Sequence, residues 1–122
     1  MDDLERVRMA LAQVRCPPVC QESELHRLIA QALASAGFDV RHEAHLAPRC
    51  RIDFLVGTVG VEVKKSRPAR GPLLRQLARY TACEQVESLL VVAPRGINLP
   101  REVGGKPVRM LALERLWGVS LP

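Results

Sequence analysis

Three ionisable residues interrupt an apolar stretch in the middle of the chain. Asp53, Glu62 and Lys64 fall within RIDFLVGTVGVEVKK, residues 51–65, where apolar residues otherwise recur as in two buried strands joined by a short turn. A buried charge is strongly destabilising unless it is paired or bound to a metal ion. These three residues are therefore the first candidates for chemistry.

The spacing of these residues favours one shared site. Because residues two apart on a strand share a face, Glu62 and Lys64 should point the same way. If the two strands pair as a hairpin, Asp53 should approach Glu62, with both neighbours of Asp53 on the opposite face. Two carboxylates and the backbone carbonyl of Val63 would form an all-oxygen site suited to Mg²⁺ or Mn²⁺. A lysine beside them would orient or deprotonate an attacking water, which suits phosphodiester hydrolysis.

The elements that must position these residues follow from apolar periodicity and turn residues. We expect helices over residues 2–15, 22–36 and 73–86, and strands over residues 38–46, 50–57, 59–65, 88–94 and 108–113. Gly37 should close the second helix, residues 95–107 should form a loop, and residues 114–118 a terminal helical turn. This order predicts one α/β domain over residues 1–122, with a mixed central sheet flanked by helices.

The three charged residues, in this order of elements, carry a resemblance. The pattern Asp53-x8-Glu62-x-Lys64 on two successive strands resembles the core of the PD-(D/E)XK nuclease superfamily, which is restriction-endonuclease-like. The order αβββαβ over about residues 21–93 is similar to the core of that superfamily, although Ile52 stands where many members have proline. The resemblance implies a phosphodiester hydrolase that depends on Mg²⁺ or Mn²⁺, with Asp53, Glu62 and Lys64 as catalytic residues.

The helix over residues 22–36 offers a further metal ligand. Glu22 and His26 are four residues apart, at one edge of a buried stripe formed by Leu25, Leu28, Ile29, Ala32 and Leu33. In this superfamily the first core helix often supplies an acidic residue, or a histidine in RecB-type nucleases, so the resemblance implies that Glu22 or His26 completes the metal site. Alternatively, Glu22 complements the helix dipole and His26 bonds the backbone.

The helix over residues 73–86 carries a second pair of polar residues. Gln76 and Tyr80 are four residues apart and share a face near Leu73 and Leu77. A Gln-x3-Tyr pair after Glu-x-Lys resembles an extra motif of RecB-type nucleases, which implies that both residues lie beside the catalytic groups and order the site. Alternatively, Tyr80 fills the core with its hydroxyl hydrogen-bonded at the rim.

Positive charge is concentrated around the strand pair. Residues 41–80 hold nine of the 18 Lys and Arg residues but only three acidic residues, although the whole chain carries a net charge of +5. A localised basic region is typical of proteins that bind polyanions. We therefore expect the basic residues that follow the catalytic lysine to hold phosphates without reading sequence: Lys65, Arg67, Arg70, Arg75 and Arg79.

The remaining features set the cellular context. The N-terminus lacks the apolar segment of a signal peptide and no stretch is long enough to span a bilayer, which predicts a cytoplasmic protein without a membrane partner. Cys16, Cys20, Cys50 and Cys83 do not form a metal-binding pattern, so we expect reduced thiols rather than a metal or iron–sulfur site.

The helix over residues 2–15 and the segment 107–118 would be additions to the core. The apolar stripe from Leu4 to Val14, or Trp117, would form either core or a dimer surface.

Three functions fit these patterns. The first is a metal-dependent nuclease, with DNA as the expected substrate and either a homodimer or a larger DNA-processing complex as its setting. The second is a nuclease-fold module that binds DNA but does not cleave it. The third is an ion-pair network that only stabilises an unrelated α/β domain. The patterns do not separate DNA from RNA, or single-stranded from duplex or branched substrates.

Overall fold

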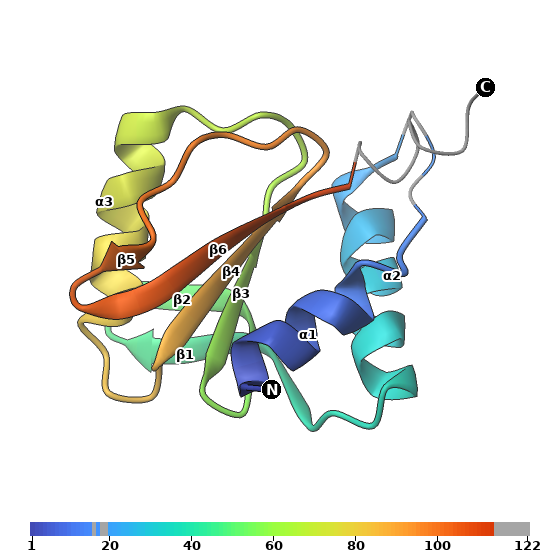
Figure 1. Cartoon of the computed structure of the whole chain (residues 1–122), viewed down its shortest axis with the longest axis horizontal. Helices are drawn as coiled ribbons and strands as arrows, with labels where there is room; N and C mark the ends of the chain where they lie inside the picture. The colour runs from blue at the N-terminus through green and yellow to red at the C-terminus, as the bar shows by residue number, and fades with distance from the viewer. Residues whose placement is uncertain (16, 18–19, 114–122) are drawn as a thin grey trace.

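A six-stranded mixed sheet lies between helices in the computed structural model, which describes residues 1–15, 17 and 20–113 (Figure 1). The helices are α1 (Asp3–Leu11), α2 (Glu22–Ser35) and α3 (Arg70–Thr81). The strands are β1 (Val40–Ala47), β2 (Cys50–Val56), β3 (Val59–Val63), β4 (Ser88–Ala93), β5 (Glu102–Val103) and β6 (Lys106–Ala112). The predicted α/β class, with a mixed sheet flanked by helices, is confirmed.

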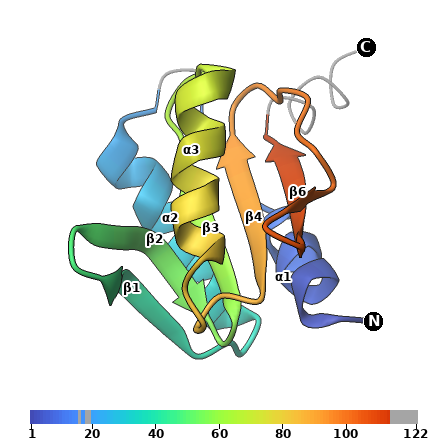
Figure 2. The same cartoon turned by 90° about the vertical axis from the view of Figure 1, so that its left-hand side faces the viewer.

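The strand order in the sheet is β1-β2-β3-β4-β6-β5. The first three strands are antiparallel neighbours joined by short turns, and Gly57 adopts the positive φ of +62° that the β2–β3 turn requires. From β3 onward the pairing changes, because β3, β4 and β6 run parallel. Parallel neighbours need a crossover, and α3 supplies the one between β3 and β4 (Figure 2).

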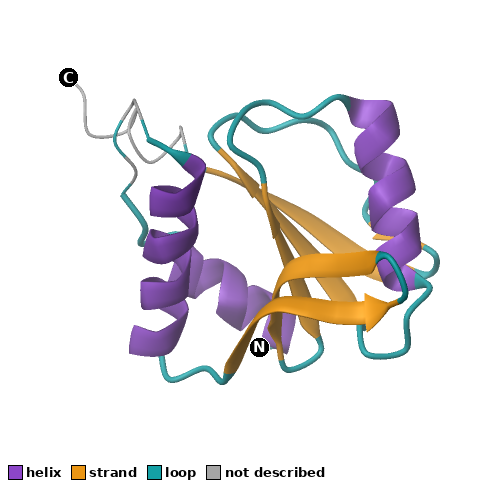
Figure 3. Ribbon diagram, turned by 180° about the vertical axis from the view of Figure 1, so that it is seen from behind, coloured by secondary structure: helices purple, strands orange, loops and turns teal. Residues whose placement is uncertain are grey.

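Two apolar clusters lie on opposite faces of the sheet. Helices α1 and α2 lie on one face of the sheet and α3 lies on the other (Figure 3). Phe54, Val61 and Leu90 pack in the cluster on the α1–α2 face, and Ile52, Leu89 and Val91 in the cluster on the α3 face. All six residues of β4 are buried, as predicted for an apolar run covered on both faces. The two faces of β3 therefore differ, with valines toward α1 and α2 and Glu62 toward α3.

Helix α2 packs and ends as its residues predict. The predicted stripe of α2 is buried against the sheet through Leu25, Ile29 and Leu33. Gly37 has a φ of +86° and closes α2, with the N–H of Gly37 bonded to the carbonyl of Ala34 and that of Phe38 bonded to the carbonyl of Leu33. The predicted glycine cap is confirmed.

Several predicted boundaries are wrong. The first helix ends at Leu11 instead of residue 15, and β1 begins at Val40 instead of residue 38. Helix α3 begins three residues early, because Pro72 is tolerated in a first turn where its missing N–H has no acceptor; it also ends at Thr81, before residue 86. The loop over residues 95–107 contains the short strand β5.

Some predictions fall outside the part of the chain that the structure describes. The terminal helical turn over residues 114–118, Cys16 and Trp117 are among the undescribed residues. The stripe from Leu4 to Val14 packs in the core on the α1–α2 face, and so does not present a free dimer surface. Among the described residues, no helix has the length and apolar character needed to cross a bilayer.

Candidate active site

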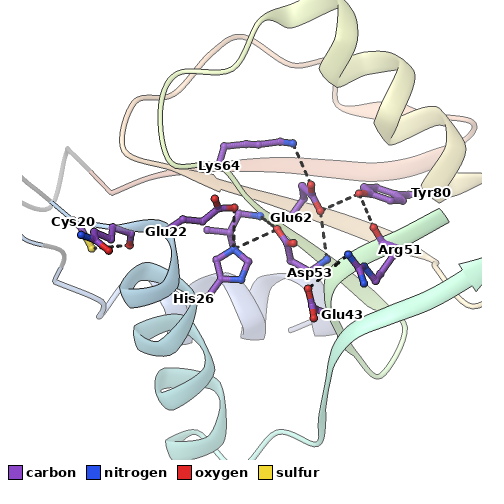
Figure 4. A network of polar contacts seen from close by, with 11 residues as sticks. Cys20, Glu22, His26, Glu43, Arg51, Asp53, Glu62, Lys64 and Tyr80 are labelled. Atoms are coloured by element: carbon purple, nitrogen blue, oxygen red, sulfur yellow. Dashed lines mark hydrogen bonds and ion pairs between the residues drawn. The ribbon is translucent and has the colours of Figure 1, made fainter. Parts of the chain in front are cut away.

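Asp53 and Glu62 meet where β2 separates from β3. The β2–β3 ladder ends with the pair Phe54 and Val61, and two side-chain hydrogen bonds replace the next rung. The N–H of Val63 donates to Oδ2 of Asp53 at 2.8 Å, and the N–H of Asp53 donates to Oε1 of Glu62 at 3.4 Å (Figure 4). The two carboxylates are therefore held at one end of the strand pair by backbone amides.

The side chain of Asp53 faces α2, next to an irregularity in the neighbouring strand. We expected Ile52 and Phe54 to share a face, but Ile52 packs in the cluster under α3 and Phe54 in the cluster under α1 and α2. On β1, Glu43 has a φ of +44° and is not paired with Asp53, although the residues on both sides of Glu43 are paired in register. The simple alternation of β2 is lost at this step, which leaves Asp53 half-buried at the junction.

Glu62 is a buried carboxylate with several polar partners. The residue is 5% exposed, Oε2 lies 3.1 Å from the ammonium of Lys64, and Oε1 accepts a hydrogen bond of 3.0 Å from the hydroxyl of Tyr80. Burial, reinforced by the nearby Asp53, raises the pKa of the Glu62 carboxyl, while Lys64 and Tyr80 act in the opposite direction. Glu62 and Lys64 point the same way from β3, as predicted.

Tyr80 anchors this carboxylate from α3. Its side chain is buried, with the residue 3% exposed, and its hydroxyl lies 3.2 Å from the carbonyl of Arg51 as well as beside Glu62. Burial and the adjacent Glu62 raise the pKa of the Tyr80 phenol far above its ordinary value, so the group remains a hydrogen-bond donor. Gln76, one turn earlier, is half-buried and lines a pocket together with Lys64.

Helix α2 places a histidine on the other side of Asp53. Nε2 of His26 lies 3.8 Å from Oδ2 of Asp53 and 3.8 Å from Oε1 of Glu22 (Figure 4). The His26 ring packs against the ring of Phe54. This nitrogen is buried and has no hydrogen-bond partner among the described residues. The Glu22 side chain is 66% exposed. The structure therefore brings His26 to Asp53 and Glu22 to His26, and it leaves the buried Nε2 of His26 unsatisfied between the Asp53 and Glu22 carboxylates.

The side chains fit a divalent cation by the chemistry of their donors. Within the described ranges, no three His, Cys, Asp or Glu side chains converge closely enough to form a ready metal site. The 3.8 Å separations at His26 exceed a hydrogen bond but are shorter than two ligand bonds of about 2.1 Å laid end to end. Carboxylates, the Val63 carbonyl and an imidazole together suit Mn²⁺ better than Mg²⁺, which prefers oxygen ligands.

The five basic residues expected to hold phosphates fall into different surroundings. Lys65 and Arg79 line a pocket of about 420 Å³ that also includes Lys64. Arg67 lines a second pocket, of about 640 Å³, and the Nε of Arg70 donates to the carbonyl of Asn98 at 3.0 Å. Arg75 lines neither pocket. Ser66 lines the first pocket and was not expected there, although its place directly after the two lysines was a usable signal.

Cys50 and Cys83 are neighbours in the fold, which their spacing in the sequence did not indicate. Cys20, Cys50 and Cys83 are free thiols. Burial, together with the neighbouring Cys83 thiol, raises the pKa of Cys50. Both thiols pack in the cluster under α3.

Comparison of the chain with protein-family models, with curated proteins and with solved structures gave no match. The chemistry of the site therefore rests on its own geometry.

Proposed function

We propose that this protein is a metal-dependent nuclease of the PD-(D/E)XK, restriction-endonuclease-like superfamily, with DNA as its substrate. One observation carries the proposal: Asp53, Glu62 and Lys64 come together where β2 and β3 separate. Two further observations support it. The elements α2, β1, β2, β3, α3 and β4 follow the order αβββαβ, and β3 and β4 are parallel neighbours. The buried Nε2 of His26 faces the Asp53 carboxylate from α2.

The residues that would hold Mn²⁺ or Mg²⁺ are Asp53, Glu62, the carbonyl of Val63 and His26, with Glu22 at the outer edge. A bound cation supplies Lewis-acid chemistry, because it polarises the phosphodiester and lowers the pKa of a water. The protein itself fixes the ligand atoms in advance. The Val63 amide holds Oδ2 of Asp53 and the Tyr80 hydroxyl holds Oε1 of Glu62, so both side chains are oriented before any ligand arrives.

Lys64 would act on the attacking water. Its ammonium lies 3.1 Å from Oε2 of Glu62, at the mouth of the site, and its side chain is only partly buried. Were Glu62 to bind a cation through Oε2, Lys64 would orient the water and offset the negative charge that develops on the phosphate. Tyr80, which is hydrogen-bonded to Glu62, would act as a positioning residue.

The alternative function is a nuclease-fold module that binds DNA without cleaving it. The observation that favours it is the ion pair between Lys64 and Glu62, which neutralises both groups as they stand. A purely structural network is disfavoured by the unsatisfied nitrogen of His26, because a network that serves only stability should bond its buried polar atoms.

Cleavage assays test the proposal. Single-stranded, duplex and branched DNA, and RNA, are incubated with Mg²⁺ or Mn²⁺ and the wild type, Asp53→Asn or Lys64→Met. Asp39→Asn is the matched control, because it removes the same charge from an exposed residue outside the site. We expect metal-dependent cutting that both site variants lose and the control keeps, with melting temperatures confirming that all are folded. Tight DNA binding without cutting under either metal would establish the binding module instead.

A further inference from the structure

A basic pocket opens beside the proposed active site. We call it the loop pocket; it lies between the end of β3, the β3–α3 loop and α3, and has a volume of about 420 Å³. Its polar lining consists of Lys64, Lys65, Ser66, Gln76 and Arg79. Lys64 belongs to both places, because its ammonium also pairs with Glu62. A group in the loop pocket would therefore lie next to the carboxylates.

The charges lining the loop pocket all have one sign. Three of its lining residues are cationic, and no carboxylate lines it. Of the three cations, Lys64 is paired with Glu62, while Lys65 and Arg79 are exposed. Cations gathered in a concave site without counter-charges attract anions from solution. The chemistry of the lining therefore fits a phosphate group.

The start of α3 adds to this positive field. Ala69 and Pro72 line the loop pocket, and Ala69 is a helix N-cap that provides no side-chain acceptor. The first turn of α3 contains no acidic residue, so its unbonded N–H groups are not neutralised by a carboxylate. The helix end thus reinforces the positive field of Lys65 and Arg79, which carry the argument on their own.

We propose that the loop pocket binds a phosphate of duplex nucleic acid adjacent to the bond that is cut, so that the substrate is recognised through its backbone. This assignment rests on the proposed nuclease function and adds the substrate class. Within the set of five basic residues, it separates Lys65 and Arg79 from Arg75, which lies on the same helix but outside the pocket.

The scarcity of exposed aromatic rings supports recognition through the backbone. Proteins that bind single strands commonly stack bases on exposed aromatic side chains. Among the described residues, Phe54 and Tyr80 are buried at 0% and 3% exposure, and the half-buried ring of Phe38 is covered by the Arg6 guanidinium. The described surface therefore offers phosphate contacts but no Phe, Tyr or Trp platform for bases.

The test measures binding without cleavage. A fluorescein-labelled DNA duplex of about 20 base pairs is titrated with the full chain in EDTA, over roughly 50 to 200 mM NaCl, and fluorescence anisotropy gives the Kd. Arg79→Gln and Arg75→Gln form the matched pair, because each removes one charge from an exposed position on α3. We expect Arg79→Gln to weaken binding about fivefold and Arg75→Gln less than twofold. The double variant Lys65→Gln/Arg79→Gln should also lower the salt slope by about one.

Each outcome bears on the proposal. Equal losses in Arg79→Gln and Arg75→Gln, or no loss in the double variant, would overturn the loop pocket even if the protein cuts DNA. Duplexes of unrelated sequence should bind within about twofold of each other, and much tighter binding of single strands would overturn recognition through the duplex backbone. If the pocket variants lose binding and no metal supports cutting by the wild type, the loop pocket stands and the nuclease proposal fails.

Discussion

The backbone amide of Val63 is hydrogen-bonded to the carboxylate of Asp53 at 2.8 Å, across the point where β2 and β3 stop pairing. The Asp53 side chain therefore accepts the hydrogen bond of a backbone N–H that lies beyond the end of the β2–β3 ladder. The same carboxylate faces His26 on α2. Asp53 thus connects the stability of the strand pair to the chemistry proposed for the site, and substitutions at this position can separate the two.

Asp53→Ala should destabilise the fold, while Asp53→Asn should affect mainly the site. The alanine variant leaves the Val63 N–H without its acceptor, and we expect a loss of roughly 1 to 3 kcal/mol in the free energy of unfolding. The asparagine variant keeps an acceptor oxygen and should lose less. Urea unfolding measures both, with Asp39→Asn as the exposed control. Equal stability of the alanine variant and the wild type would show that this hydrogen bond has no structural role.

The stability of Glu62→Gln relative to the wild type should rise with pH. The pKa of Glu62 is raised above its ordinary value of 4.5, so its favourable contribution is complete below 4.5 and is lost as pH rises through the raised value. Glutamine does not ionise, so the variant does not lose this contribution as the pH rises. Urea unfolding of both proteins from about pH 4 to pH 8 should therefore give a difference that grows with pH. A constant difference would contradict the raised pKa.

His26→Ala should weaken Mn²⁺ binding. Its buried Nε2 has no hydrogen-bond partner in the described structure and lies 3.8 Å from Asp53, where a cation would satisfy both. Calorimetric titration should show an increase of at least about tenfold in the Kd for Mn²⁺. His45→Ala, at an exposed position on β1, is the matched control and should bind as the wild type does. Equal affinities in the two variants would remove His26 from the metal site.

Gly60→Ala should destabilise the sheet on the α3 face, two residues before Glu62 on β3. A Cβ at this position would lie 2.6 Å from Cδ1 of Ile52 and 2.8 Å from Cδ2 of Leu89, both fully buried. We expect a loss of about 1 to 3 kcal/mol, because both of these fully buried side chains would have to shift. Gly71→Ala, whose nearest contact would be 3.7 Å away at the Arg75 side chain, is the control for adding a methyl group. Thermal melts of both variants would settle the comparison.

Part of the candidate site could be predicted because it depends on local periodicity. The alternation of β3 puts Glu62 and Lys64 on one face, and the glycine turn returns the chain so that Asp53 meets Glu62. The helical spacing of Glu22 and His26 likewise brings both to the same edge of α2. Each of these relationships involves residues close together on one element, or on two elements joined by a tight turn.

The remainder depends on tertiary packing. The positive φ of Glu43 has no sequence signature, so the change of face between Ile52 and Phe54 could not be anticipated. Arg70 is drawn to the carbonyl of Asn98 by a loop that has no periodic pattern, and this separates it from the other basic residues. The proximity of Cys50 and Cys83 arises only when α3 packs on β2. Contacts of this kind, between residues far apart in the sequence, form only when the helices and strands pack together.

The hydrogen bond between Val63 and Asp53 also provides a spectroscopic probe. An amide proton that bonds a carboxylate shifts its resonance when the charge on that carboxylate changes. In a ¹⁵N-labelled sample, the Val63 cross-peak would therefore respond to a diamagnetic cation such as Mg²⁺ before any substrate is known. The protein thus carries its own reporter at the proposed site, on a backbone atom that no substitution needs to alter.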